Sequence, residues 1–295
     1  MIRKYGIAGL LIIIFAEITM FLRIKPFVYW FTPLVWFGYI LFVDSVVFML
    51  KGSSLITRKK LKLAFIFLIS LFFWLIFEFY NIFLGGWYYK NLPESTVEKL
   101  AMGYLSFSTI VPAVFETSEL VQTAFFKENI KIKARIKYNK NLTRILILTG
   151  IAFMSLPFFF SSPIMWVFVW SGFIFLIDPI LYMLQNKKSI IAQLEERRYG
   201  KIISLFVAGY ICGFLWEFWN YWAYTKWYYT VPILEEIKIF EIPAIGFLAY
   251  GFFALELYVM YNFIRFFFSS RIFEILASYQ AKELKMLNKL RGKHQ

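Results

Sequence analysis

The amino-acid sequence predicts an all-α, polytopic membrane protein of about eight transmembrane helices, built as two tandem parallel four-helix repeats. First, 60% of the 295 residues are hydrophobic and the mean hydropathy is +0.64, which is far more apolar than a soluble domain of this size. Second, apolar runs near the roughly 20 residues that span a bilayer recur along the whole chain. Third, short motifs of the first half return in the second half at a nearly constant offset.

Charged residues, prolines and glycines bound the apolar runs and so predict the individual helices. No small-residue cleavage site follows the first run, which we therefore interpret as a membrane helix and not as a signal peptide. The expected helices cover residues 5–22, 27–50, 62–84, 101–126, 145–161, 163–185, 201–225 and 243–268. The expected domains are a first membrane repeat over 1–126, a basic cytoplasmic linker over 127–144, a second membrane repeat over 145–268, and a basic amphipathic cytoplasmic tail over 269–295.

The distribution of basic residues predicts the orientation of the chain. With the N-terminus in the cytoplasm, 26 of the 32 Lys and Arg residues fall in cytoplasmic segments and 6 fall outside. This bias predicts an integral, multi-pass protein of the cell membrane with both termini cytoplasmic. The net charge of +14 sits in short loops beside membrane helices, so we expect anionic lipid headgroups as partners at the cytoplasmic face, and no nucleic acid.

The internal repeat is carried by four matches. The motif WFGYILFVD at 36–44 recurs as WSGFIFLID at 170–178, and FEFYN at 77–81 recurs as WEFWN at 216–220. Trp87–Tyr89 recurs as Trp227–Tyr229, and Glu116 recurs as Glu256. Because each copy holds four helices, both copies enter and leave the membrane on the same side, which predicts a pseudo-twofold axis along the membrane normal.

Repeat-matched carboxyl groups at membrane depth are the candidate catalytic residues. Such groups are costly in lipid and usually face protein or water. The only two aspartates of the chain occupy the same repeat position, near the cytoplasmic end of a span, where a structural hydrogen bond is the alternative to a functional role. The candidates are Asp44, Asp178, Glu78, Glu217, Glu116 and Glu256.

Two of these glutamates are followed by asparagine three residues later. Glu78 with Asn81, and Glu217 with Asn220, share a helix face, so the amide can orient the carboxyl group. A carboxyl group removed from water stays protonated and can donate a proton near neutral pH, although matched polar pairs also join helices. Glu116 and Glu256 lie near mid-span and would form an acid–base pair if they faced a shared cavity.

Aromatic residues follow the outer ends of two spans, at Trp87, Tyr88, Trp227 and Tyr228. An aromatic belt at the membrane interface is one explanation. The alternative is a pocket for a lipid or a cationic intermediate, because aromatic faces stabilise positive charge.

The run LWEFWNYWAYTKWYYTVPILEEIKIFEIP, at 215–243, resembles the membrane-embedded lycopene cyclase domain of carotenoid pathways. The resemblance rests on Trp216–Glu217, Trp227–Tyr228, Pro232, Glu235–Glu236 and Glu241, with a weaker counterpart in Phe77–Glu78, Trp87–Tyr88, Pro93, Glu94 and Glu98. This sequence has Glu where the family usually has Asp, and its paired acids follow Pro at a shorter spacing. The resemblance implies tandem helical units, an isoprenoid or carotenoid-like substrate, and substrate-binding roles for Glu235, Glu236 and Glu241.

The scarcity of His and Cys restricts the chemistry. The single cysteine, Cys212, and the single histidine, His294, provide no disulfide, no His/Cys metal site and no Ser-His-Asp triad, so we expect neither a metal nor a cofactor.

The leading hypothesis is a cofactor-free, cyclase- or hydratase-type enzyme acting on an isoprenoid or other membrane lipid. A proton-coupled carrier is an alternative, because carriers use parallel repeats and helices broken at residues such as Pro112 and Gly246. A structural or partner-binding membrane subunit is the third hypothesis.

Overall fold

The computed structural model describes residues 1–58, 60–126, 138–184, 187–232 and 236–268. Within these ranges, eight helices are long and apolar enough to cross a membrane: Lys4–Phe21, Phe31–Lys51, Lys60–Leu84, Thr96–Phe125, Lys140–Phe158, Pro163–Met183, Gly200–Trp222 and Ala244–Phe267. Large apolar side chains such as Leu11, Leu68 and Leu148 are more than half exposed, as expected for helices that face lipid. The prediction of a helical, multi-pass membrane protein is confirmed.

The two halves of the chain contain similar but not identical series of elements. The first half contains α1 (Lys4–Phe21), α2 (Phe31–Lys51), α3 (Leu55–Arg58), α4 (Lys60–Leu84), β1 (Trp87–Lys90), α5 (Thr96–Ser108) and α6 (Ile110–Phe125). The second contains α7 (Lys140–Ser155), two short 3₁₀ turns (Leu156–Phe158 and Pro163–Met165), α8 (Trp166–Met183), α9 (Ile190–Glu195), α10 (Gly200–Trp222), β2 (Lys226–Tyr229), β3 (Lys238–Ile239), β4 (Ile242–Pro243), α11 (Ala244–Phe247) and α12 (Ala249–Phe267). Residues 127–137 of the expected linker and the whole expected tail lie outside the described residues.

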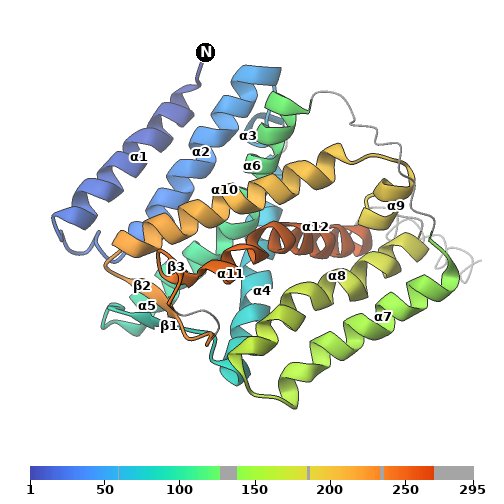
Figure 1. Cartoon of the computed structure of the whole chain (residues 1–295). Helices are drawn as coiled ribbons and strands as arrows, with labels where there is room; N and C mark the ends of the chain where they lie inside the picture. The colour runs from blue at the N-terminus through green and yellow to red at the C-terminus, as the bar shows by residue number, and fades with distance from the viewer. Residues whose placement is uncertain (59, 127–137, 185–186, 233–235, 269–295) are drawn as a thin grey trace, which may run out of the picture.

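Two helical hairpins flank a central group of helices. The α1–α2 pair lies at one side of the molecule, the α7–α8 pair lies at the other, and α6, α10 and α12 pack between them (Figure 1). Glycines allow the first hairpin to close: a Cβ atom at Gly9 would lie 2.5 Å from the backbone oxygen of Gly38. At that distance no larger residue fits without moving a helix.

The expected span 101–126 is interrupted. It begins earlier, at Thr96, and breaks at Thr109 into α5 and α6, because Pro112 has no N–H to continue the helix. Ser70 of α4 forms hydrogen bonds with backbone groups at this break. Its hydroxyl donates to the Phe107 oxygen at 2.6 Å and accepts from the Val111 N–H at 3.0 Å. Non-helical backbone at membrane depth requires such partners.

The second half has a matching break. The span between Ala244 and Phe267 is interrupted at Leu248, 139 residues after the break at Thr109. The hydroxyl of Tyr210, from α10, donates to the Leu248 oxygen at 3.1 Å.

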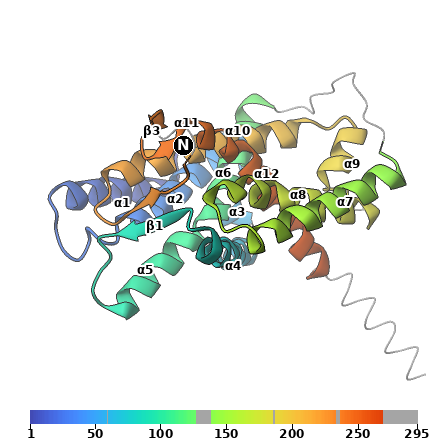
Figure 2. The same ribbon diagram turned by 60° about the horizontal axis from the view of Figure 1, so that its bottom comes forward.

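Two strands join the halves at one end of the bundle. β1 and β2 form an antiparallel pair, in which Trp87 lies opposite Tyr229 and Tyr89 lies opposite Trp227. Helix α5 lies beside this pair in both views (Figures 1 and 2). We call this end of the bundle the sheet end, and the opposite end, where α2 ends at Lys51 and α10 begins at Gly200, the basic end. The sequence predicted only loops where these strands lie.

Candidate functional site

Glu78 lies at the sheet end of α4, surrounded by aromatic hydrogen-bond donors. Its Oε1 accepts from the indole N–H of Trp74 at 2.8 Å, from the indole N–H of Trp87 at 3.1 Å, and from the hydroxyl of Tyr89 at 2.5 Å. Trp74 lies one helical turn before Glu78, while β1 brings the other two donors back toward the helix. The carboxyl group is therefore held in one orientation by three rigid side chains.

Glu217 has a corresponding environment in α10 and is completely buried. Its Oε1 accepts from the hydroxyl of Tyr229 at 2.6 Å and from the hydroxyl of Tyr250. The indole N–H of Trp227 donates to the Tyr229 oxygen at 2.9 Å, which extends the network by one more aromatic ring. The second carboxyl oxygen of Glu217 is buried without a hydrogen bond to any described residue.

The tyrosines of the two strands stay protonated. Burial, and then the negative charge of the neighbouring glutamate, raises the pKa of Tyr89 and that of Tyr229 well above the ordinary value. Each phenol therefore remains a hydrogen-bond donor to its glutamate at neutral pH.

The two predicted asparagines hold the strands in place. The side-chain oxygen of Asn81 accepts from the N–H groups of Gly86 and Trp87, and its amide donates to the Trp87 oxygen at 2.9 Å. Asn220 makes the matching pair of bonds to the backbone of Trp227, both at 2.9 Å. Each asparagine thus positions the strand that supplies donors to the glutamate of the same helix.

An apolar cavity of about 310 Å³ lies against these donors, between α4, α5, α10, α12 and the two strands. Six of the ten tryptophans line it, together with the tyrosines bound to the two glutamates: Trp36, Trp74, Trp87, Trp170, Trp216, Trp227, Tyr89, Tyr229 and Tyr250. Leu100, Gly103 and Phe107 of α5 form part of its wall. The cavity can hold an apolar molecule, with phenol hydroxyls as the link to the carboxyl groups behind the wall.

The predicted aromatic residues divide into two groups. Trp87 and Trp227 line the cavity, whereas Tyr88 and Tyr228 stack on one another with ring centroids 5.7 Å apart. The ammonium groups of Lys90 and Lys226 lie 4.9 and 4.7 Å from the centre of the Tyr228 ring. Tyr88 and Tyr228 therefore make cation–π contacts beside the cavity and not within it.

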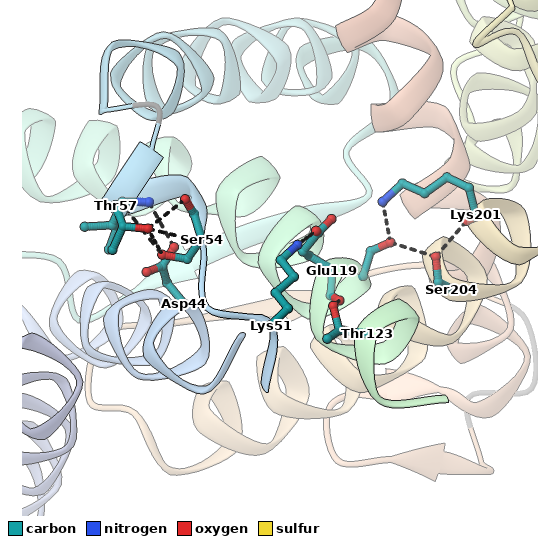
Figure 3. A network of polar contacts seen from close by, with 10 residues as sticks. Asp44, Lys51, Ser54, Thr57, Glu119, Thr123, Lys201 and Ser204 are labelled. Atoms are coloured by element: carbon teal, nitrogen blue, oxygen red, sulfur yellow. Dashed lines mark hydrogen bonds and ion pairs between the residues drawn. The ribbon is translucent and has the colours of Figure 1, made fainter. Parts of the chain in front are cut away.

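Asp44 and Asp178 lie at the basic end, where each binds the backbone of the short helix that follows its span. Asp178 accepts from the N–H groups of Ile190, at 2.6 Å, and Ile191, at 2.9 Å, at the start of α9. Asp44 accepts from the N–H of Ile56 in α3, at 3.0 Å, and from the hydroxyl of Tyr5, at 2.6 Å. Figure 3 shows Asp44 with Ser54 and Thr57 of this network. Both aspartates have a structural role in capping a short helix.

Glu116 and Glu256 are fully buried but do not line the cavity. Glu116 of α6 lies near Asp44, Lys51 and Lys62, so it belongs to the basic end, and neither of its carboxyl oxygens has a hydrogen bond to the described residues. Both carboxyl oxygens of Glu256 in α12 are buried without a hydrogen bond to the described residues. Glu116 and Glu256 therefore lie in different environments, and they do not face the aromatic cavity as the predicted acid–base pair would require.

The described acids implied by the resemblance make no hydrogen bond with Glu78 or Glu217. Glu241 forms an ion pair with Lys226, Glu236 is exposed, and Glu235 lies outside the described residues. Within the part of the chain that the structure describes, no three His, Cys, Asp or Glu side chains gather into a metal site.

Sequence reasoning missed several of the cavity residues. Trp74 precedes Glu78 by four residues, which is the helical spacing that brings two side chains together. Tyr89 and Tyr229 were the third residues of the matched Trp-Tyr-Tyr motifs, but only the paired strands show that they reach the glutamates.

Comparison with models of known protein families, with curated proteins and with solved structures finds no match to this chain.

Proposed function

We propose that this protein is an intramembrane, cofactor-free enzyme that acts on an isoprenoid or carotenoid-like lipid by acid–base catalysis. The observation that carries the proposal is the apolar cavity whose wall contains Tyr89 and Tyr229, each hydrogen-bonded to a glutamate that does not itself line the cavity. The resemblance of residues 215–243 to the lycopene cyclase domain points to the same substrate class.

In the proposed reaction, the lipid lies against the tryptophan rings and receives a proton at a carbon–carbon double bond. The step requires Glu217 in its protonated form, with its carboxyl group donating to the Tyr229 oxygen, which reverses the hydrogen bond of the structure. Tyr229 then gives its hydroxyl proton to the substrate and takes up the carboxyl proton of Glu217. The carbocation that forms is stabilised by the faces of the surrounding indoles. Loss of a proton to the same network, after ring closure, restores both side chains and leaves an isomer of the substrate. In a hydratase, water would add to the cation instead.

We also propose that the chain consists of two copies related by a pseudo-twofold axis along the membrane normal. The span breaks, the capping aspartates and the glutamate–asparagine pairs of one half each have a counterpart in the other. The positive-inside bias supports a cell-membrane protein whose basic end faces the cytoplasm, together with both termini.

A proton-coupled carrier is the second candidate function, and one observation favours it. The spans broken at Thr109 and Leu248 resemble the interrupted helices that form transport sites in many carriers. In a carrier, the cavity would have to connect to both membrane surfaces in turn, and Glu116 and Glu256 would carry the protons.

Lipid mass spectrometry of the natively extracted protein tests the enzyme proposal. We would compare the wild type with Glu217→Gln, Tyr229→Phe and Glu256→Gln. We expect an isoprenoid to co-purify with all four proteins, and its product form to be lost from the first two variants only. Bulk phospholipid alone in every sample would contradict the proposal and favour a carrier or a structural subunit.

A cavity-filling variant tests whether the lipid occupies the cavity. A Cβ atom at Gly103 would meet only the Phe107 ring, at 3.9 Å, so Gly103→Leu fills the cavity without straining the backbone. Leu105→Phe adds bulk to the outer, lipid-facing side of the same helix and is the control. We expect the co-purifying isoprenoid to be lost from Gly103→Leu and retained by Leu105→Phe. Equal retention by both variants would place the lipid elsewhere.

A further inference from the structure

A second cavity, of about 230 Å³, lies at the basic end between α6, α9, α10 and α12. Every residue that lines it is polar, four of them are positively charged, and none is acidic. The four cations are Lys187, Lys188, Arg198 and Lys201. A group of like charges around one polar cavity raises the local potential and attracts an anion.

No acidic side chain lines the cavity, and three glutamates of the surrounding segments have partners of their own. Glu195 accepts from the backbone N–H of Tyr138 at 3.1 Å and from the hydroxyl of Tyr182 at 2.7 Å. Glu196 pairs with the Nε atom of Arg198, and Glu119 pairs with Lys51. Glu196 therefore partly neutralises Arg198, while the lining of the cavity itself contains no acidic side chain.

Lys201 provides a positive charge that the described residues do not neutralise by an ion pair. Its ammonium group donates to the Ser118 hydroxyl at 2.9 Å, and Ser118 lies 3.1 Å from the hydroxyl of Ser204 (Figure 3). These hydroxyls are neutral, so they orient the ammonium group without cancelling its charge.

Backbone hydrogen bonds hold the walls of this cavity together. Arg198 donates from its guanidinium group to the Lys187 oxygen at 2.8 Å. The side-chain amide of Gln193, which is 4% exposed, donates to the Lys188 oxygen at 3.0 Å and to the Tyr258 hydroxyl at 3.3 Å. The segment that carries Lys187 and Lys188 is thus fixed against α9 and α12 before any ligand binds, which reduces the entropic cost of binding.

We propose that this cavity is a binding site for a phosphate group. Three lysines and one arginine line one small polar volume, and ammonium and guanidinium groups are the chemistry that recognises a phosphate dianion or diphosphate. The site lies at the opposite end of the bundle from the aromatic cavity, so it is independent of the proposed catalysis. The phosphate group belongs either to the headgroup of an anionic phospholipid in the adjacent leaflet or to a soluble phosphate ester.

Calorimetric titration with inorganic pyrophosphate, at matched ionic strength, tests this site. The full-length protein would be placed in nanodiscs of phosphatidylcholine, as wild type, Lys187→Gln, Lys201→Gln and Lys140→Gln. Lys140 is an exposed lysine outside the cavity and serves as the control. We expect pyrophosphate to bind the wild type and Lys140→Gln equally, and to bind the other two variants about tenfold more weakly or worse.

Repeating the titration in nanodiscs of equal parts phosphatidylcholine and phosphatidylglycerol distinguishes the two sources. Weaker pyrophosphate binding in the mixed nanodiscs identifies a competing lipid headgroup, and unchanged binding identifies a soluble phosphate ester. Absence of pyrophosphate binding to the wild type, or equal binding to Lys187→Gln and the wild type, would overturn the proposal. Lys187 is exposed, so this variant gives a result even if Lys201→Gln does not fold.

Discussion

Tyr88 lies directly opposite Tyr228 in the antiparallel pair of β1 and β2, with the two ring planes inclined by 19°. The two residues are 140 positions apart, which is also the offset between the repeated Trp-Tyr-Tyr motifs. The same residue of each copy therefore meets its counterpart, and the flanking pairs are mirrored, with Trp87 opposite Tyr229 and Tyr89 opposite Trp227. This pairing is what a twofold axis through the centre of the strands would produce, and it supports the proposed tandem repeat.

The strand pairing predicts a specific cross-link. Residues opposite each other in an antiparallel pair have Cα atoms about 4.5–5.5 Å apart, which is within the range of a disulfide. We expect the double variant Tyr88→Cys/Tyr228→Cys to form an intramolecular disulfide on mild oxidation, seen as a mobility shift that reductant reverses. Tyr88→Cys/Lys226→Cys is out of register and should not cross-link. Equal cross-linking of both pairs would contradict the register.

The capping hydrogen bonds of Asp178 predict a stability effect. Asp178→Ala removes the acceptor of two N–H groups, and we expect the free energy of unfolding to fall by about 1–3 kcal/mol. Asp178→Asn keeps one acceptor oxygen and should lose less. Reversible unfolding in mixed micelles measures both values. If Asp178→Asn were as stable as the wild type but lost the isoprenoid product, Asp178 would have a role in the chemistry beyond capping.

The spans were predictable from the sequence because length and hydropathy are local properties. The predicted helix over 62–84 corresponds to α4 at Lys60–Leu84, and the one over 201–225 corresponds to α10 at Gly200–Trp222. The cavity was not predictable, because Trp74, Trp170 and Trp216 come from three different spans that only the packing brings together. The strands were missed because four-residue segments after a helix carry no periodic pattern long enough to identify.

The break at Thr109 predicts a role for Ser70. Ser70→Ala leaves the Phe107 oxygen and the Val111 N–H without their side-chain partner, so we expect a loss of about 1–3 kcal/mol in the free energy of unfolding. Hydrogen exchange should increase over residues 107–111 in particular. Ser171→Ala is the matched control, because the Ser171 hydroxyl bonds only within its own helix, to the oxygens of Val167 and Phe168. Unchanged exchange at the break in Ser70→Ala would show that other groups satisfy this backbone.

The proposed orientation predicts which engineered cysteines react from outside the cell. Glu94 lies at the sheet end and Lys140 begins α7 at the basic end, and both side chains are exposed. The native Cys212 is fully buried, so it should contribute little background labelling. We expect a membrane-impermeant maleimide to label Glu94→Cys in intact cells, and to label Lys140→Cys only after the membrane is permeabilised, because the proposed orientation places the basic end in the cytoplasm. Labelling of Lys140→Cys alone in intact cells would reverse the orientation, and with it the leaflet from which a headgroup reaches the phosphate site.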